Sequence, residues 1–278
     1  MDKSAAGEGV TPVVNSLSEE ILWARKPWMR VEDLILWLAW ALTLAFNAYS
    51  EMGKLGGMNN AEISGQVHSW FTPAGYAFSI WGLIYLGLAV WLFFFCKSPV
   101  GRKPVWHMPM SASGLVFVLS CLLNVAWLTV WHMELFVSSI VLIVSLSITV
   151  WSLYARDRIF TRQVTDWAPL SLYGSWLLVA TLTNCWYVLL RAHQSWEGSV
   201  PVQSLVTLAL LLALILVSYL MRRLLGDWMV GLVVLWSGIA IGVKLMGQSA
   251  PMAVAIIILT TLGAIVIYAP WKRILTKA

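Results

Sequence analysis

The chain has 278 residues, of which 60% are hydrophobic and 11% are charged, and it carries a net charge of +5. Soluble domains usually contain about 25% charged residues, so this composition excludes an ordinary soluble protein. The 18 tryptophans fall mostly inside long apolar segments, which indicates a membrane protein with an aromatic interior.

Eight apolar segments are long enough to cross a bilayer as helices. The hydrocarbon core is about 30 Å thick and requires roughly 20 apolar residues in helical form. Inside it the backbone must satisfy its own hydrogen bonds, which favours helices over strands. In chain order the segments cover residues 31–50, 75–96, 109–131, 134–155, 167–190, 202–221, 228–246 and 251–271. The sequence therefore predicts an all-α, polytopic membrane helix bundle with about eight transmembrane helices.

Lysine and arginine divide unequally between the two ends of these segments. Of the 18 basic residues, 15 fall in the N-terminal arm, in every second connector and in the C-terminal tail, and the others are Lys54, Arg191 and Lys244. Because cytoplasmic loops are enriched in basic residues, we expect a multi-pass protein with both termini in the cytoplasm, in the inner membrane if the source is bacterial. This asymmetry explains the positive charge, and no basic surface interleaved with aromatics indicates a nucleic-acid partner.

The longest connector on the opposite side covers residues 51–74. It is rich in glycine and ends in His68-Ser69-Trp70-Phe71-Thr72-Pro73. The glycines predict a mobile loop. Trp70 is expected either to anchor this loop at the membrane interface or to fold back over the helix ends.

Polar and aromatic side chains repeat at helical spacing in several of the first five segments. Side chains three or four residues apart share one face of a helix, and polar groups within spans tend to face the bundle interior. We therefore expect one aromatic, amide-lined cavity in the outer half of the bundle. Its expected ligand-binding residues are Asn47, Trp70, Phe78, Trp81, Tyr85, Asn124, Trp127, Trp131, Tyr173, Trp176 and Asn184. The alternative, that these residues only pack the helices together, stays open at this point.

Three stretches resemble the TspO/MBR family, the tryptophan-rich sensory proteins related to the mitochondrial translocator protein. Tyr173-Gly-Ser-Trp176-Leu-Leu-Val-Ala180-Thr-Leu-Thr-Asn184 is similar to the family's Y-x-x-W-x-x-x-A-T-x-x-N signature. Asn124-Val-Ala-Trp127, followed by Trp131, resembles the N-x-x-W pattern of its third helix. Trp70-Phe-Thr-Pro73, leading to Trp81 and Tyr85, resembles its loop-to-second-helix motif, although a single proline stands here where the family has two.

The resemblance covers residues 31–190 and implies a TspO-like five-helix bundle. It implies that the bundle binds a planar hydrophobic small molecule of the porphyrin or haem type, without a covalent cofactor, in a sensory or regulatory role. It also implies that a homodimer is one candidate assembly. We therefore expect a cytoplasmic N-terminal arm at residues 1–30, the five-helix bundle at 31–190, and a three-helix C-terminal membrane extension at 191–278.

Catalysis, metal binding and transport are the alternatives to ligand binding in a sensory role. No carboxylate pair and no Cys/His cluster lies at membrane depth, so the sequence indicates neither a conventional catalytic site nor a metal site. His132 is expected to anchor a helix end rather than bind haem. Light-dependent degradation of a bound porphyrin and transport of a small hydrophobic or tetrapyrrole-type molecule stay open as alternatives.

Two features of the seventh segment need separate interpretations. Lys244 lies near its outer end, so we expect the ammonium group to extend to the interface rather than to form a retinal Schiff base. Gly238 and Gly242 form a small-xxx-small motif, which allows close helix approach. We expect this motif to pack the C-terminal extension onto the five-helix bundle.

Overall fold

The computed structural model describes residues 27–53, 55–98, 102–105, 108–160 and 163–269. Most of the predicted N-terminal arm and the basic C-terminal tail lie outside them. Within the described residues the chain forms helices and no strand, which confirms the all-α fold class. The long helices are α2 (Pro27–Glu51), α4 (Ile80–Lys97), α5 (Ala112–His132), α6 (Phe136–Phe160), α7 (Val164–Ala192), α9 (Val200–Leu225), α10 (Met229–Met246) and α11 (Ala250–Tyr268). The short ones are α3 (Asn60–Gly65), the 3₁₀ helix η1 (Gly75–Ser79) and α8 (Gln194–Glu197).

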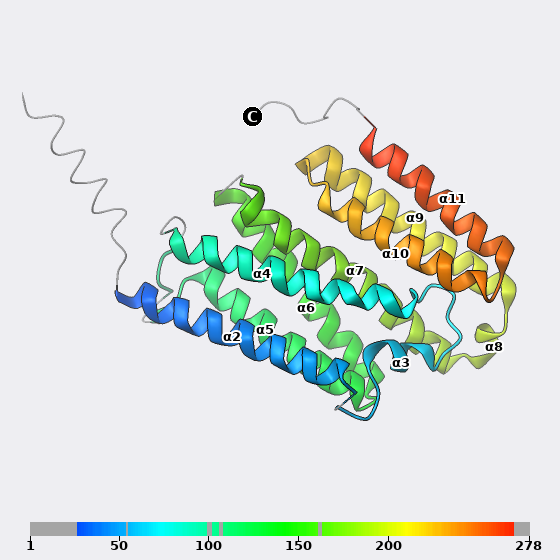
Figure 1. Ribbon diagram of the computed structural model, residues 1–278, viewed down its shortest axis with the longest axis horizontal. Coiled ribbons are helices and arrows are strands. Elements are labelled where there is room, and N and C mark those ends of the chain that lie inside the picture. The colour runs from blue at the N-terminus through cyan, green and yellow to red at the C-terminus, as the bar shows by residue number, and fades with distance from the viewer. Residues whose placement is uncertain (1–26, 54, 99–101, 106–107, 161–162, 270–278) are drawn as a thin grey trace, which may run out of the picture.

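The long helices run side by side along the length of the molecule (Figure 1). Among the described residues, seven of them are long and apolar enough to cross a membrane, all except α7. Helix α7 has 29 residues and carries Asp166 in its first turn and Arg191 in its last. It nevertheless runs alongside the others through the bundle (Figure 1). Because the long helices alternate in direction, α2 begins and α11 ends on the same side, as an even number of passes requires.

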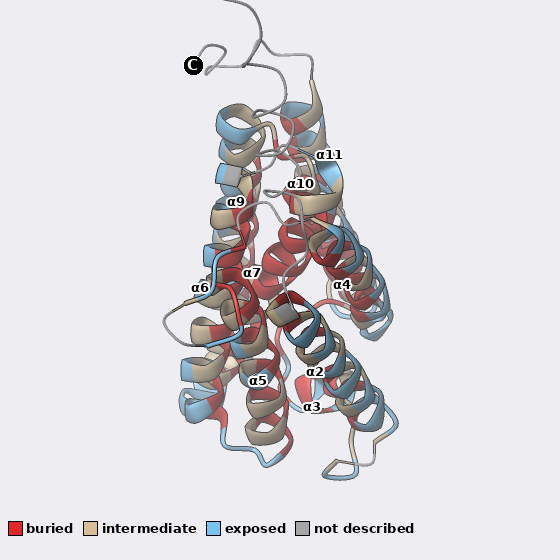
Figure 2. Cartoon of the chain, turned by 90° about the vertical axis from the view of Figure 1, so that its left-hand side faces the viewer, coloured by how far each residue is buried: buried red, intermediate tan, exposed pale blue. Residues whose placement is uncertain are grey.

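Helix α7 lies at the centre of the packing. It contacts α4, α6 and α10, and residues are buried along most of its length (Figure 2). Gly174 allows α6 to approach, because a Cβ at this position would lie only 2.9 Å from Cε2 of Trp151. Helices α9, α10 and α11 pack against one another, and α10 joins this group to α7. The signature helix of the first bundle is therefore covered on one side by the C-terminal helices.

The glycine motif of α10 packs differently from the prediction. A Cβ on Gly238 would lie 2.4 Å from Oγ1 of Thr260, and one on Gly242 would lie 2.6 Å from Cγ1 of Ile257. Both neighbours belong to α11. The motif thus brings α10 and α11 together within the C-terminal group, because the side chains of Thr260 and Ile257 occupy the space that a side chain on either glycine would need. It does not face the five-helix bundle.

The connector at residues 51–74 is more ordered than its glycines predict. Helix α3 begins at a capping box, in which the Asn59 side chain accepts from the backbone N–H of Glu62 while the Glu62 carboxylate accepts from the N–H of Asn59. Such a cap satisfies backbone donors that a helix start leaves free. Trp70 is 5% exposed and Phe71 is fully buried, so Trp70 folds back into the protein and is not an interfacial anchor.

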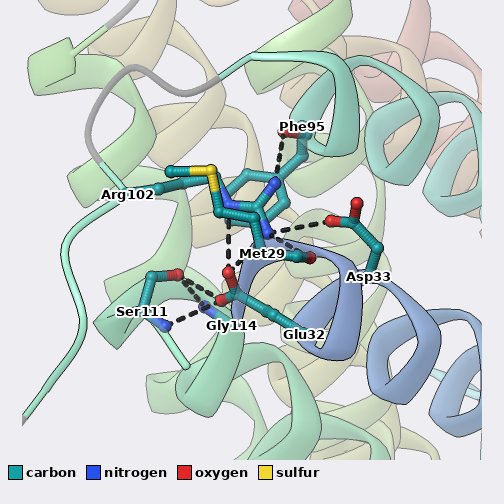
Figure 3. A network of polar contacts seen from close by, with 7 residues as sticks. All are labelled: Met29, Glu32, Asp33, Phe95, Arg102, Ser111 and Gly114. Carbon is teal, nitrogen blue, oxygen red and sulfur yellow. Dashed lines mark hydrogen bonds and ion pairs between the residues drawn. The ribbon is translucent and has the colours of Figure 1, made fainter. Parts of the chain in front are cut away.

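A buried ionic cluster joins the ends of the helices on the side where α2 begins (Figure 3). The guanidinium group of Arg102 donates from Nε to Oε2 of Glu32 at 3.0 Å and from Nη2 to Oδ1 of Asp33 at 2.8 Å. The other carboxylate oxygen of Glu32 accepts from the backbone N–H of Ser111 at 2.8 Å. These contacts tie α2 to the connector between α4 and α5.

Candidate functional site

A cavity lies between α3, η1, α4, α5 and α7, in the half of the bundle that contains α3. Its walls are mostly aromatic and carry a few polar groups. It is lined by Asn60, Ser64, Pro73, Phe78, Trp81, Trp127, Trp131, Trp176, Val179, Ala180, Thr183 and Asn184. We call this cavity the aromatic pocket.

The aromatic pocket is narrow. Its cavity volume is about 30 Å³, and one water needs about 10–15 Å³. The pocket in this conformation accommodates about two waters, so any larger ligand has to displace part of its wall.

Five aromatic side chains line this cavity in two groups of contacting rings. The ring of Trp81 lies 6.4 Å from that of Trp127, which lies 6.3 Å from Trp131 in a stacked arrangement. The ring of Phe78 meets that of Trp176 edge to face at 6.0 Å. These rings lie on η1, α4, α5 and α7. The helical spacing of these aromatic residues in the sequence therefore places their side chains around one pocket.

Six of the predicted site residues line the pocket: Phe78, Trp81, Trp127, Trp131, Trp176 and Asn184. The others, Asn47, Trp70, Tyr85, Asn124 and Tyr173, do not line it. Tyr85 lies one turn further along α4, where its ring stacks on Trp81 at 5.9 Å. Trp70 is buried, and its backbone N–H donates to Oε1 of Gln203 at 3.2 Å.

Three of the residues outside the pocket form a hydrogen-bonded chain across the bundle. Nδ2 of Asn47 donates to Oδ1 of Asn124 at 2.8 Å. Nδ2 of Asn124 donates to the hydroxyl of Tyr173 at 3.0 Å. The chain links α2, α5 and α7, and all three residues are buried. Their amide and phenol groups thus join helices, which was the alternative interpretation of these positions.

Asn184 is bonded to α6 through Ser139. Its Nδ2 donates to Oγ of Ser139 at 3.0 Å, and its Oδ1 lies 3.1 Å from the same hydroxyl. The one hydrogen of that hydroxyl is shared between Oδ1 of Asn184 and the carbonyl of Phe136 at 2.7 Å. The Asn184 amide therefore joins α7 to α6 at the edge of the pocket that it lines.

Several other polar atoms of the lining residues have no partner among the described residues. They are Oδ1 of Asn60, the indole N–H of Trp127, the indole N–H of Trp176 and the hydroxyl of Thr183. A buried polar group without a partner costs about 1–3 kcal/mol. Groups of this kind, gathered around one cavity, are typical of a site whose partners arrive with a ligand or with water.

Sequence reasoning missed the contribution of α3 to the pocket. Asn60 and Ser64 lie one helical turn apart on α3, and both line the cavity. The signal was present, because Asn59 followed three residues later by Glu62 is a capping pattern. Thr183 was also missed, although it precedes Asn184 in the signature helix.

His132 and Lys244 both have structural partners. Nδ1 of His132 faces the carbonyl of Leu128 at 2.8 Å, and a carbonyl only accepts, so this nitrogen carries the hydrogen. Nε2 then accepts from the hydroxyl of Ser50 at 3.0 Å, and neither nitrogen is directed at the pocket. Nζ of the half-buried Lys244 donates to the carbonyl of Ser69 at 3.2 Å, so the side chain reaches the connector between α3 and η1.

A comparison with models of protein families identifies the family of this chain. A family model described as TSPO-like protein matches residues 33–271. The chain belongs to the TSPO-like family. This confirms the resemblance to TspO/MBR proteins and, with the apolar helices, a multi-pass membrane protein of the TspO type.

The family match continues beyond the five helices from which the resemblance was derived. It includes α9, α10 and α11, so these helices belong to the matched part of this TSPO-like protein. The division of the chain near residue 190 stays a prediction. No curated protein and no solved structure matches this TSPO-like chain.

Proposed function

We propose that this TSPO-like protein binds a planar hydrophobic ligand of the porphyrin type in the aromatic pocket, and that binding serves a sensory or regulatory role. The observation that carries the proposal is the surface formed by Phe78, Trp81, Trp127, Trp131 and Trp176 around a cavity with unpartnered polar groups. We also propose that the end of the bundle carrying the ionic cluster faces the cytoplasm, because most basic residues belong to that end.

The chemistry of the pocket suits a flat ligand with polar edges. Indole rings gain about 0.5–1.5 kcal/mol from a well-placed aromatic partner beyond the area that the contact buries. The indole N–H groups of Trp127 and Trp176 are donors that suit carboxylates or ring nitrogens of a ligand. Oδ1 of Asn60 is an unpartnered acceptor in the same pocket. Apolar walls with a few polar groups are what small-molecule sites usually present.

Binding of a porphyrin-sized ligand depends on enlargement of the pocket, because its volume is small. Sites for ligands of this size usually measure about 300–1,000 Å³, whereas the cavity in this conformation measures about 30 Å³. Binding therefore requires the wall to open. Association that needs a conformational change is slower than the usual 10⁵–10⁷ M⁻¹s⁻¹, so we expect binding in this protein to be slow and saturable.

A fluorescence titration with protoporphyrin IX tests the proposal. The wild-type protein should show saturable quenching of tryptophan emission, because the rings that line the pocket would lie beside the bound porphyrin. Trp176→Leu removes one aromatic surface, and Asn184→Ala removes an amide from the pocket wall. Losses of about 1–3 kcal/mol correspond to a dissociation constant raised roughly five- to a hundredfold.

Trp228→Leu is the matched control. Trp228 lies at the opposite end of the bundle, where its ring contacts Trp167 at 6.0 Å. Its loss should lower the total emission without changing the affinity. Unchanged affinity in folded Trp176→Leu and Asn184→Ala protein, or equal weakening in Trp228→Leu, would show that the quenching reports partition into detergent and would overturn the proposal.

A further inference from the structure

The segment that joins α3 to η1 forms part of the pocket wall. Pro73 of this segment lines the pocket, as do Ser64 before it and Phe78 after it. We call residues 66–77, which include this segment and the first three residues of η1, the pocket loop. A ligand larger than the existing space has to move this wall or the helices behind it, so the contacts that hold the pocket loop determine how readily the pocket opens.

Gln203 of α9 holds the first half of the pocket loop. Its Oε1 accepts from the backbone N–H of Trp70 at 3.2 Å, and its Nε2 donates to the backbone carbonyl of His68 at 2.9 Å. The side chain thus pairs with the backbone on both sides of Ser69. Gln203 is 1% exposed. A buried amide satisfied in this way costs little, but each of its partners would be left unpaired if it were removed.

Helix α10 holds the pocket loop with a row of three residues. Trp236, Ala240 and Lys244 are four residues apart and therefore share one face of the helix. Nε1 of Trp236 donates to the carbonyl of Ala77 at 3.1 Å, and the carbonyl of Ala240 accepts from the backbone N–H of Ala74 at 3.1 Å. Nζ of Lys244 donates to the carbonyl of Ser69 at 3.2 Å. This face of α10 follows the pocket loop from Ser69 to Ala77.

A contact from α8 completes the attachment. Oε1 of Glu197 accepts from the backbone N–H of His68 at 2.5 Å, and the backbone carbonyl of Glu197 accepts from Nε2 of Gln203 at 3.2 Å. The pocket loop is therefore bonded through its backbone to α8, α9 and α10. All of these helices follow α7 in the chain, whereas the opposite wall of the pocket is built from α5 and α7.

We propose that Gln203 and Lys244 are positioning residues that hold the pocket loop closed, so that α9 and α10 control ligand access to the aromatic pocket. This inference rests on the proposed function for its ligand, but the attachment of the loop can be measured without one. It assigns the C-terminal helices a role that the five-helix resemblance does not explain. The pocket opens when the pocket loop moves away from α9 and α10, and the hydrogen bonds to Gln203 and Lys244 break in that movement.

Hydrogen exchange measured on the purified full-length protein tests the attachment directly. Gln203→Met keeps the length of the side chain, Lys244→Met shortens it by one atom, and both remove its hydrogen bonds. Lys244→Met removes one bond to the loop and should speed amide exchange within residues 66–77 by about fivefold. Gln203→Met removes two such bonds and should speed exchange more, and the double variant should exceed either single one. Lys244→Arg keeps a donor for the carbonyl of Ser69 and should restore slow exchange.

Ser218→Ala is the matched control on α9. Ser218 is also fully buried, but its hydroxyl donates to the carbonyl of Leu214 within the same helix. It should leave exchange in the pocket loop unchanged. Faster exchange spread evenly over the whole protein in Gln203→Met and Lys244→Met, or no change in the loop, would overturn the proposal, because the residues would then stabilise the fold without controlling the loop.

Access to the pocket provides the second readout. Thr183→Cys places a thiol on the pocket wall, in a background where Cys96, Cys121 and Cys185 are replaced by serine. Gln203→Met should raise the rate at which a small methanethiosulfonate modifies this thiol by about fivefold, with Ser218→Ala as control. An unchanged rate of thiol modification would overturn the proposal that Gln203 controls access to the pocket.

Ligand kinetics separate this inference from the proposed function. If protoporphyrin IX binds, Gln203→Met and Lys244→Met should raise its association and dissociation rates together and change the affinity less. If the porphyrin does not bind while loop exchange and thiol modification both accelerate, the proposed ligand is wrong and the control of access by α9 and α10 stands. If it binds with unchanged rates in both variants, the control of access is wrong.

Discussion

The ionic cluster around Arg102 allows a quantitative prediction about the free energy of unfolding. Arg102 and Glu32 have side chains that are 1% and 0% exposed, so both charges are removed from water (Figure 3). Arg102→Met would leave the Glu32 carboxylate with Ser111 as its remaining hydrogen-bond partner. Removing one member of a buried ion pair costs about 3–5 kcal/mol. The contacts from Ser111 offset part of this, so we expect the free energy of unfolding to fall by about 3 kcal/mol.

A double-mutant cycle distinguishes this explanation from simple loss of packing. Glu32→Gln alone keeps an acceptor oxygen but removes the negative charge that lies closest to the guanidinium, and Asp33 still accepts at 2.8 Å. In the double variant neither charge of the pair remains, so the loss should be smaller than the sum of the single losses by roughly 1–3 kcal/mol. Lys97→Met is the control, since Lys97 is exposed and lies over the ring of Phe93.

The assay is unfolding of the purified protein in bicelles by increasing fractions of a denaturing detergent, followed by tryptophan fluorescence. The midpoint should fall strongly for Arg102→Met and hardly change for Lys97→Met. Additive losses in the double variant, or an Arg102→Met protein as stable as Lys97→Met, would refute the reasoning that the buried charges stabilise each other.

Two further predictions concern the packing of the last helices and the orientation of the bundle. Gly238→Ala should lower the free energy of unfolding by about 1–3 kcal/mol, because the new methyl would lie 2.4 Å from Oγ1 of Thr260; Gly82→Ala, where nothing lies within 4 Å, should not. Equal stability of the two variants in the same unfolding assay would contradict the close approach of α10 and α11. In intact cells and a cysteine-free background, an impermeant maleimide should label Gln194→Cys but not the exposed Leu225→Cys at the other end. The reverse pattern would place the ionic cluster outside the cytoplasm.

The helices could be predicted because membrane thickness sets their length. Each of the eight predicted segments corresponds to a long helix, with ends that differ by a few residues. Helix α7 was recognised by its length and signature, although it is not among the seven helices long and apolar enough to cross a membrane, because polar and aromatic residues such as Tyr173 and Asn184 lie in its middle. The partner of the glycine motif was not predictable in the same way, because spacing identifies a close-packing face without saying which helix meets it.

The candidate site was predictable in part. The rings of Trp81, Trp127 and Trp176 share a surface because their spacing places them on inward faces. The same spacing could not show that Asn47 and Asn124 bond to each other at 2.8 Å, because periodicity gives a face and not the distance between two helices. The contact between Gln203 and the pocket loop joins residues 133 positions apart in the sequence, and no local pattern indicates it.

The absorbance of the purified protein tests most directly whether the aromatic pocket binds a planar tetrapyrrole-like ligand. Cells expressing the full chain would be supplied with excess porphyrin precursor, and the protein would be purified in detergent by size exclusion. We predict a porphyrin absorbance band that elutes with the folded protein, near one ligand per chain. The band should be strongly reduced in Trp176→Leu and retained in Trp228→Leu. Absence of the band from wild-type protein, or an equal band in Trp176→Leu, would contradict the claim.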